Sequence, residues 1–223
     1  MTIAFINAWG ILLRGGPMMW PIFLLSVIAL SVGIEKLLFL SSVEKNMKKL
    51  KPVFFKAIQE NRMKDALVIC EENPDGFGRI CKTGLMKFGS SMGLIKASME
   101  GAAGFEIYVL KRRLNLLAFI PNAAVLLGLL GTTNALCVVF HAVQMRSNAL
   151  NPLSLGDMSS GIWQALLTTS AGLVVGIISF AIYNFTASRV NDLVAAFEQT
   201  ISEAAELLQA VSQLDRSAGV DPS

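Results

Sequence analysis

The sequence predicts an all-α membrane protein with three transmembrane helices and long helical extensions outside the membrane. The chain has 223 residues, of which 53% are hydrophobic and 16% are charged, whereas an average soluble domain has about 25% charged residues. Its apolar residues gather into three runs, each at least as long as the roughly 20 residues that cross a hydrocarbon core. The polar stretches between and after these runs repeat apolar residues at helical spacing.

The N-terminal part of the chain contains the first of these runs. Residues 1–16 are amphipathic and would lie at the membrane surface, although a frayed terminus explains them equally well. Residues 17–40 form the first predicted span. Pro21 falls in its first turn, where a proline costs little, and Glu35 and Lys36 suit a membrane interface.

Residues 41–113 form a predicted polar helical region. Apolar residues recur there at helical spacing, namely Val43, Met47, Leu50, Phe54 and Ile58. We expect Asn61 to cap a second helix that runs through Cys70. A longer helix is expected from near Leu94 through Arg113 and on into the membrane.

The second and third spans are predicted at residues 114–144 and 158–188, joined by a short loop at 145–157. Pro121 lies inside the second span and is expected to kink it. The third span contains no charged residue and is rich in Thr, Ser, Ala and Gly. This composition predicts a helix that packs inside an assembly, and it is compatible with a position beside a polar path.

A final amphipathic helix is predicted at residues 189–215, followed by a disordered tail at 216–223. Its apolar residues alternate at steps of four and three, which is a heptad seam: Val190, Val194, Phe197, Ile201, Ala204, Leu208 and Val211.

The distribution of basic residues predicts the orientation. The stretch from Lys36 through Arg113 holds 15 of the 19 Lys and Arg residues, whereas Arg146 is the only one between the second and third spans. Because basic flanks stay cytoplasmic, we expect the N-terminus outside, and the middle region and the C-terminal helix in the cytoplasm.

Small residues mark one face of each of the last two spans. Gly128, Thr132 and Ala135 share a face of the second, and Gly131 lies in the same Leu126–Thr132 segment. The third span carries Ala165, Thr169, Gly172 and Gly176 on one face. Such faces allow close helix packing, which is the simpler reading. The functional reading is that the Thr132 and Thr169 hydroxyls serve ions or a buried carboxylate.

Polar side chains inside the spans are few. Gln164 must face protein or water, either bonding across helices or joining a polar path. His141 is read as an interface residue rather than a proton relay. Apart from Glu35 at the edge of the first span, no span contains Asp or Glu. If the chain conducts ions, a partner therefore has to supply the carboxylate.

The sequence contains no set of residues typical of an enzyme. It has no nucleophile–His–acid set, no phosphate loop and no metal cluster, so no catalysis, cofactor, metal or nucleic-acid binding is expected. Its three cysteines (Cys70, Cys81 and Cys137) lack ligand-like spacing, which argues against a zinc site or a disulfide framework.

Three segments resemble the ExbB/TolQ branch of the MotA/TolQ/ExbB family. Gly15 to Ile22, with Glu35-Lys36 at the end of the span, resembles the branch's first helix. Leu126 to Thr132 resembles its LLGLLGT segment, and Gln164 to Asn184 resembles its EALLxTxxGLxxAIPxxxxYN segment. Three positions depart from the pattern: Gln164 replaces a Glu, Val125 replaces a Pro, and Ala135 replaces a Gly.

The resemblance implies a homo-oligomeric ring, a pentamer in that family, in the lipid of the bacterial inner membrane with a periplasmic N-terminus. The ring would enclose a dimer of a single-span partner of the ExbD/TolR type that carries a protonatable Asp. Ion flow, with protons as the expected ion, would energise a TonB-like or Tol/Pal-like envelope protein. The family's two pore-facing threonines correspond to Thr132 and Thr169, and we add Thr168 and Gln164 to the predicted ion pathway.

Two other functions were weighed. The three departures leave open a non-conducting scaffold of the same shape. A small solute transporter is disfavoured, because the sequence has no inverted repeat and no pair of broken helices.

Overall fold

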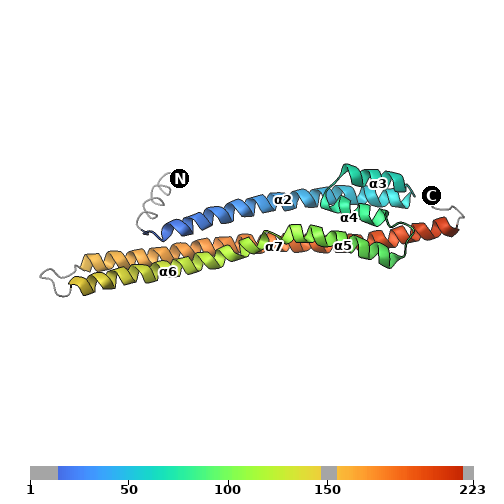
Figure 1. The fold of residues 1–223 in the computed structure, drawn as a ribbon. Helices are drawn as coiled ribbons and strands as arrows, with labels where there is room; N and C mark the ends of the chain where they lie inside the picture. Colours follow the sequence, from blue (N-terminus) through green and yellow to red (C-terminus); the bar gives the residue numbers. More distant parts are fainter. Residues whose placement is uncertain (1–14, 147–154, 218–223) are drawn as a thin grey trace, which may run out of the picture. The chain divides into compact units, whose positions relative to one another are not determined.

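The computed structural model describes residues 15–146 and 155–217, and within these ranges it contains helices and no strand. The helices in chain order are α2 (Met19–Gln59), α3 (Met63–Glu72), α4 (Gly76–Leu85), α5 (Met92–Lys111), α6 (Leu114–Arg146) and α7 (Leu155–Ser217) (Figure 1). The all-α class is therefore confirmed. The expectations for residues 1–14, for most of the 145–157 loop and for residues 218–223 lie outside the described residues.

Among the described residues, three helical stretches are long and apolar enough to cross a membrane. They are Met19–Gln59, Met92–Met145 and Met158–Leu214, with mean hydropathies of 2.2, 2.0 and 2.1 over their most apolar windows. Each contains one of the apolar runs from which the sequence predicts a span.

The helices contribute to two compact units. One, called the apolar unit here, contains the chain up to Glu35 together with Leu114–Phe185. The other, called the polar unit, contains Lys36–Arg113 together with the chain from Thr186 onward. α2 and α7 each contribute to both units.

The polar unit is built around the predicted heptad seam of α7. Five of the seven seam residues are buried, and Val194 and Val211 are half-buried. The seam is therefore confirmed. The C-terminal half of α2 supplies further core residues at the predicted spacing. Met47, Leu50, Phe54 and Ile58 are buried, and Val43 is half-buried.

Asn61 ends α2 instead of starting α3, so the predicted cap is wrong. Its φ is 56°, in the left-handed region. Its backbone N–H donates to the carbonyl of Ile58 at 3.0 Å, and the N–H of Arg62 donates to the carbonyl of Ala57 at 2.9 Å. This pair of bonds is a Schellman motif, which asparagine tolerates at its left-handed position. The residue that precedes α3 is Arg62.

Two predicted helix boundaries also differ. The long helix expected from near Leu94 is interrupted, because α5 ends at Lys111 and α6 begins at Leu114. Arg112 between them keeps right-handed helical angles (φ −51°, ψ −40°), so the interruption is slight. By contrast, the third span and the C-terminal amphipathic helix, expected as separate elements, form the continuous 63-residue helix α7.

Candidate functional site

In the apolar unit, the backbones of α6 and α7 touch at two glycines. A β-carbon added to Gly172 would lie 2.7 Å from the carbonyl oxygen of Ala124 and 2.8 Å from the Cα of Gly128. A β-carbon on Gly128 would lie 3.2 Å from the Cα of Gly172. Such approaches require residues without a side chain, and they are typical of helix pairs in membranes.

The close contact continues along both helices. A β-carbon on Gly176 would lie 2.8 Å from Val125 Cγ2, and one on Gly131 would overlap the methyl group of Thr168. Ala135 on α6 and Ala165 on α7 are both buried. The small residues of these two faces thus lie at helix contacts or in the interior of the unit.

Thr169 lies at this contact, called the α6–α7 seam here, and Thr132 directly follows Gly131 on α6. The Thr169 hydroxyl donates to the carbonyl of Gly128 on α6 at 3.3 Å, and the Thr132 hydroxyl donates to Leu129 in its own helix at 2.6 Å. Both residues are only half-buried. A hydroxyl that donates one hydrogen bond still has lone pairs that can accept another. Each oxygen can therefore accept a hydrogen bond from a further donor.

Thr168 and Gln164 face the turn that leads into α2. Thr168 is 1% exposed, and its Oγ1 lies 3.1 Å from the carbonyl oxygen of Gly15 and 2.7 Å from that of Gln164. Gly16 has a φ of +74°, and a β-carbon there would overlap the side-chain amide nitrogen of Gln164. Within the chain these two polar residues therefore hold the turn before α2 against α7. His141, the other polar candidate, is exposed on α6.

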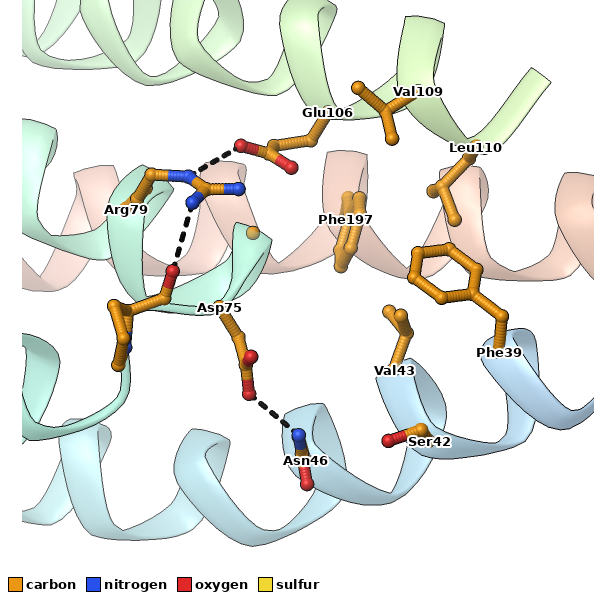
Figure 2. A pocket seen from close by; sticks show the side chains of 12 residues that line it. Phe39, Ser42, Val43, Asn46, Asp75, Arg79, Glu106, Val109, Leu110 and Phe197 are labelled. Atoms are coloured by element: carbon orange, nitrogen blue, oxygen red, sulfur yellow. Dashed lines mark hydrogen bonds and ion pairs between the residues drawn. The ribbon is translucent and has the colours of Figure 1, made fainter. Parts of the chain in front are cut away.

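The polar unit contains a cavity of about 300 Å³ (Figure 2). Its lining comes from α2, α4, α5, α7 and the turn before α4: Phe39, Ser42, Val43, Asn46, Pro74, Asp75, Gly76, Arg79, Glu106, Val109, Leu110 and Phe197. Figure 2 shows apolar side chains such as Phe39 and Phe197 at one end and the charged groups at the other. At the polar end, Asn46 Nδ2 donates to Asp75 Oδ2 at 2.6 Å.

Glu106 is the buried charge of this cavity. Arg79 donates through Nε to Glu106 Oε1 at 2.7 Å and through Nη1 to the carbonyl of Pro74 at 2.9 Å. The hydrogen bond that Arg79 donates to Glu106 raises the pKa of Arg79 above its ordinary value. A β-carbon on Gly76 would lie 2.6 Å from Glu106 Oε2, which places the carboxylate at the N-terminus of α4, where the helix dipole favours a negative charge.

The prediction from sequence missed Glu106, although a signal existed. The buried residues of α5 are Ile95, Met99, Ala103, Glu106 and Leu110, at steps of four and three. Glu106 is the one charged residue at an inward position of that helix. A carboxylate on the apolar face of a predicted amphipathic helix indicates that a cation or a hydrogen-bond donor is paired with it.

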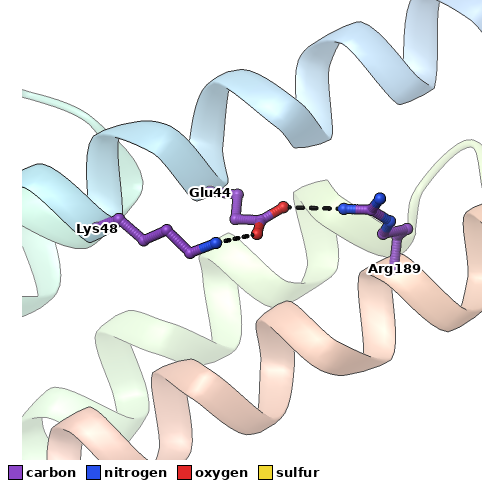
Figure 3. Close-up of polar contacts among 3 residues, drawn as sticks. All are labelled: Glu44, Lys48 and Arg189. Carbon is purple, nitrogen blue, oxygen red and sulfur yellow. Dashed lines mark hydrogen bonds and ion pairs between the residues drawn. The ribbon is translucent and has the colours of Figure 1, made fainter.

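A second charge cluster joins α2 to α7 within the polar unit (Figure 3). Glu44 accepts from Lys48 Nζ at 2.6 Å and from Arg189 Nη1 at 3.1 Å. These two cations, Lys48 first, lower the pKa of Glu44 below its ordinary 4.5. Glu44 and Arg189 are 145 positions apart, so no local pattern pointed to this pair.

Comparisons with known proteins match most of this chain. The model of the MotA/TolQ/ExbB proton channel family matches residues 51–199. This range includes all of α6 and the part of α7 that carries Gln164, Thr168 and Thr169. Two proteins of Synechocystis sp., named for their likeness to the biopolymer transport protein ExbB (ExbB-like 1 and ExbB-like 3), are each 28% identical to this chain. The first match covers 79% of this chain and 69% of the relative, and the second covers 77% and 81%.

A relative from Methanothermobacter thermautotrophicus, named as a homologue of ExbB, is 30% identical over 104 residues. That match covers 47% of this chain and 35% of the relative.

Proposed function

The chain belongs to the MotA/TolQ/ExbB proton channel family, and we propose from this membership that it is an ExbB-type subunit that couples ion flow across the bacterial inner membrane to mechanical work. The observation that carries the proposal is the family match over residues 51–199. The three long apolar helices make the chain a multi-pass membrane protein. The proposed orientation has a periplasmic N-terminus and a cytoplasmic C-terminus, and it rests on the placement of the Lys and Arg residues.

The proposed working form is a homo-oligomeric ring, a pentamer by analogy with the family. It encloses a dimer of a single-span partner of the ExbD/TolR type. That partner supplies the Asp that the predicted second and third spans of this chain lack. The energised protein is an envelope protein of the TonB or Tol/Pal kind, and protons are the proposed ion.

The proposed ion path runs beside the α6–α7 seam, at Thr132 and Thr169, with Thr168 and Gln164 near one end. A carboxylate inside a membrane is costly unless hydrogen bonds compensate it. The hydroxyl protons of Thr132 and Thr169 are each donated to a backbone carbonyl, so the lone pairs of these half-buried oxygens point away from that bond. Each oxygen is therefore able to accept a hydrogen bond from a protonated carboxyl group or from water. These threonines would stabilise the proton-carrying state of the partner's Asp.

The chain offers a matched pair of threonines for a test. Thr132 and Thr133 both donate to the carbonyl three residues earlier, at 2.6 and 2.9 Å, but Thr132 is half-buried and Thr133 is exposed. The complex with its copurified partner is reconstituted into vesicles. Proton uptake is driven by a potassium diffusion potential and followed with an enclosed pH-sensitive dye.

We expect Thr132→Val and Thr169→Val to slow proton uptake about tenfold, the equivalent of one lost hydrogen bond. Thr133→Val should leave uptake unchanged, and Thr169→Ser, which keeps the hydroxyl, should retain most of it. Equal uptake by wild type and both valine variants, with oligomer size unchanged, would contradict the hydroxyl role.

A non-conducting scaffold is the second candidate function. It is favoured by the protomer itself, in which Gln164 lies against Gly16 and the three threonine hydroxyls all bond to backbone carbonyls. Under this alternative, vesicles that contain the complex take up protons no faster than protein-free vesicles, and Gln164→Glu does not change this result. Uptake that depends on the copurified partner excludes the scaffold.

A further inference from the structure

Two cysteines from neighbouring helices, Cys70 and Cys81, lie where α3 meets α4. Cys70 is in the last turn of α3 and Cys81 is in the middle of α4. Both are free thiols, and they are 2% and 0% exposed. The third cysteine, Cys137, is exposed on α6 and belongs to the other unit.

Contacts around the two cysteines set the register of α3 against α4. Glu71 Oε1 lies 2.8 Å from Lys82 Nζ, so the residues that follow the two cysteines form an ion pair. A β-carbon on Gly78, one turn before Cys81, would lie 3.1 Å from the carbonyl oxygen of Cys70. The backbones are therefore close at this level, where both thiols are buried.

The two thiols differ in how readily they ionise. The hydrogen bond from Cys81 lowers the pKa of Cys70 below its ordinary value, and Lys82 adds to this effect. Burial raises the pKa of Cys81. Because the thiolate is the reactive form, Cys70 is the thiol that would react first with an oxidant. Cys81 is the thiol that would then attack the oxidised Cys70 sulfur.

Burial would protect the pair if α3 were firmly held, but α3 is a marginal element. It has ten residues, and Ala66 and Cys70 are its only buried residues. Its N-cap residue, Arg62, makes no side-chain capping hydrogen bond, and Glu71 and Glu72 lie in its last turn, where the helix dipole disfavours negative charge. Short helices depend on tertiary packing, so we expect local opening of α3 to expose both thiols to small reagents.

We propose that Cys70 and Cys81 form a reversible disulfide that joins α3 to α4 when the protein meets a peroxide. The Cys70 thiolate attacks one peroxide oxygen, so an S–O bond forms, the O–O bond breaks and hydroxide leaves. The Cys81 sulfur then attacks the Cys70 sulfur, so the S–S bond forms and the S–O bond breaks. The released hydroxide takes up the Cys81 proton as water.

The net reaction converts two thiols and hydrogen peroxide into one disulfide and two waters. The thiols lose two electrons to the peroxide. A small dithiol such as dithiothreitol reverses the reaction, and it is itself oxidised to its cyclic disulfide. In a reducing compartment such a disulfide is transient and responds to oxidant.

The test uses the full-length complex purified in detergent, in a Cys137→Ser background that removes the exposed thiol. The protein is treated with hydrogen peroxide, quenched, denatured and alkylated, and then digested without reductant. We expect a peptide pair linked through Cys70 and Cys81, loss of both alkylatable thiols, and recovery of both after dithiothreitol. In Cys81→Ser, Cys70 should instead accumulate as a sulfenic acid that dimedone traps.

Hydrogen exchange provides a readout that does not depend on variants at the two cysteines. Amides of α3 should exchange more slowly in the oxidised protein than in the reduced protein, because the cross-link prevents the opening of α3. The proposal is overturned if both thiols stay alkylatable after peroxide, or if the only cross-links join different subunits. These readouts do not depend on ion conduction, so they stand whether or not the proposed channel function is correct.

Discussion

At Gly172, the backbones of α6 and α7 leave no room for a β-carbon. The nearest atoms to an added β-carbon would be the Ala124 carbonyl oxygen and the Gly128 Cα, at 2.7 and 2.8 Å, and neither can rotate away as a side-chain end would. An alanine here therefore forces the two helices apart. Gly104 on α5 is the opposite case, since nothing lies within 4 Å of its added β-carbon.

We expect Gly172→Ala to lower the free energy of unfolding by about 1–3 kcal/mol, as overpacking does. Gly104→Ala should raise it by about 0.5–1 kcal/mol, because alanine favours a helix over glycine. The measurement is unfolding in mixed micelles of rising SDS content, followed by circular dichroism. Equal stability of Gly172→Ala and wild type would mean that the α6–α7 contact is looser than the structure has it.

At the scale of elements, the polar unit joins α2 to α7 through the Glu44 cluster. The pKa of Glu44 is lower in the folded protein than its ordinary 4.5, first through Lys48 and then through Arg189. A carboxyl group whose pKa falls on folding stabilises the fold above its unfolded pKa. That stabilisation is lost as the pH falls below 4.5 towards the folded value.

The prediction that follows concerns acid stability. The melting temperature of the wild type should fall as the pH drops below 4.5. The melting temperature of Glu44→Gln should fall less steeply over that pH range, because this variant lacks the group that titrates. Lys51 and Gln199 lower the pKa of Glu203 in the same way. Glu203→Gln should therefore also reduce the acid-induced fall in melting temperature, independently of Glu44. Because Glu44 is solvent-accessible, the difference should be small and should shrink in high salt. If the melting temperature of Glu44→Gln falls as steeply with acid as that of the wild type, the prediction is wrong.

At the scale of the whole molecule, three candidate spans and the distribution of basic residues together predict an orientation. If all three candidates cross the membrane, the described segments before the first and after the last lie on opposite sides of it. Of the 19 Lys and Arg residues, 15 lie from Lys36 through Arg113, and this bias favours a cytoplasmic location for that region.

We expect a short epitope inserted between residues 147 and 154 to be accessible to antibody on intact spheroplasts. An epitope after Ser223 should become accessible only after the membrane is permeabilised. A cytoplasmic protein probed in the same samples reports leakage. The opposite pattern would reverse the proposed orientation and would place the polar unit outside the cytoplasm.

The sequence by itself determined the features that depend on local pattern. The three apolar helices follow from run length, and the α7 seam through Phe197, Ile201 and Leu208 follows from periodicity along one helix. The family also followed from short motifs, and the match over residues 51–199 confirms it. Thr132 and Thr169 were selected from those motifs, and their place in an ion path remains a prediction.

Only the tertiary structure decided which residues face one another. The bond from Thr168 to Gly15 joins positions 153 apart, and the ion pair of Glu44 and Arg189 joins positions 145 apart. Cys70 and Cys81 gave no ligand-like spacing, yet the register of α3 on α4 makes them neighbours. Periodicity tells which side of a helix is buried, but the register between two helices depends on how their side chains and bare glycine backbones fit, and that fit exists only once both helices are packed.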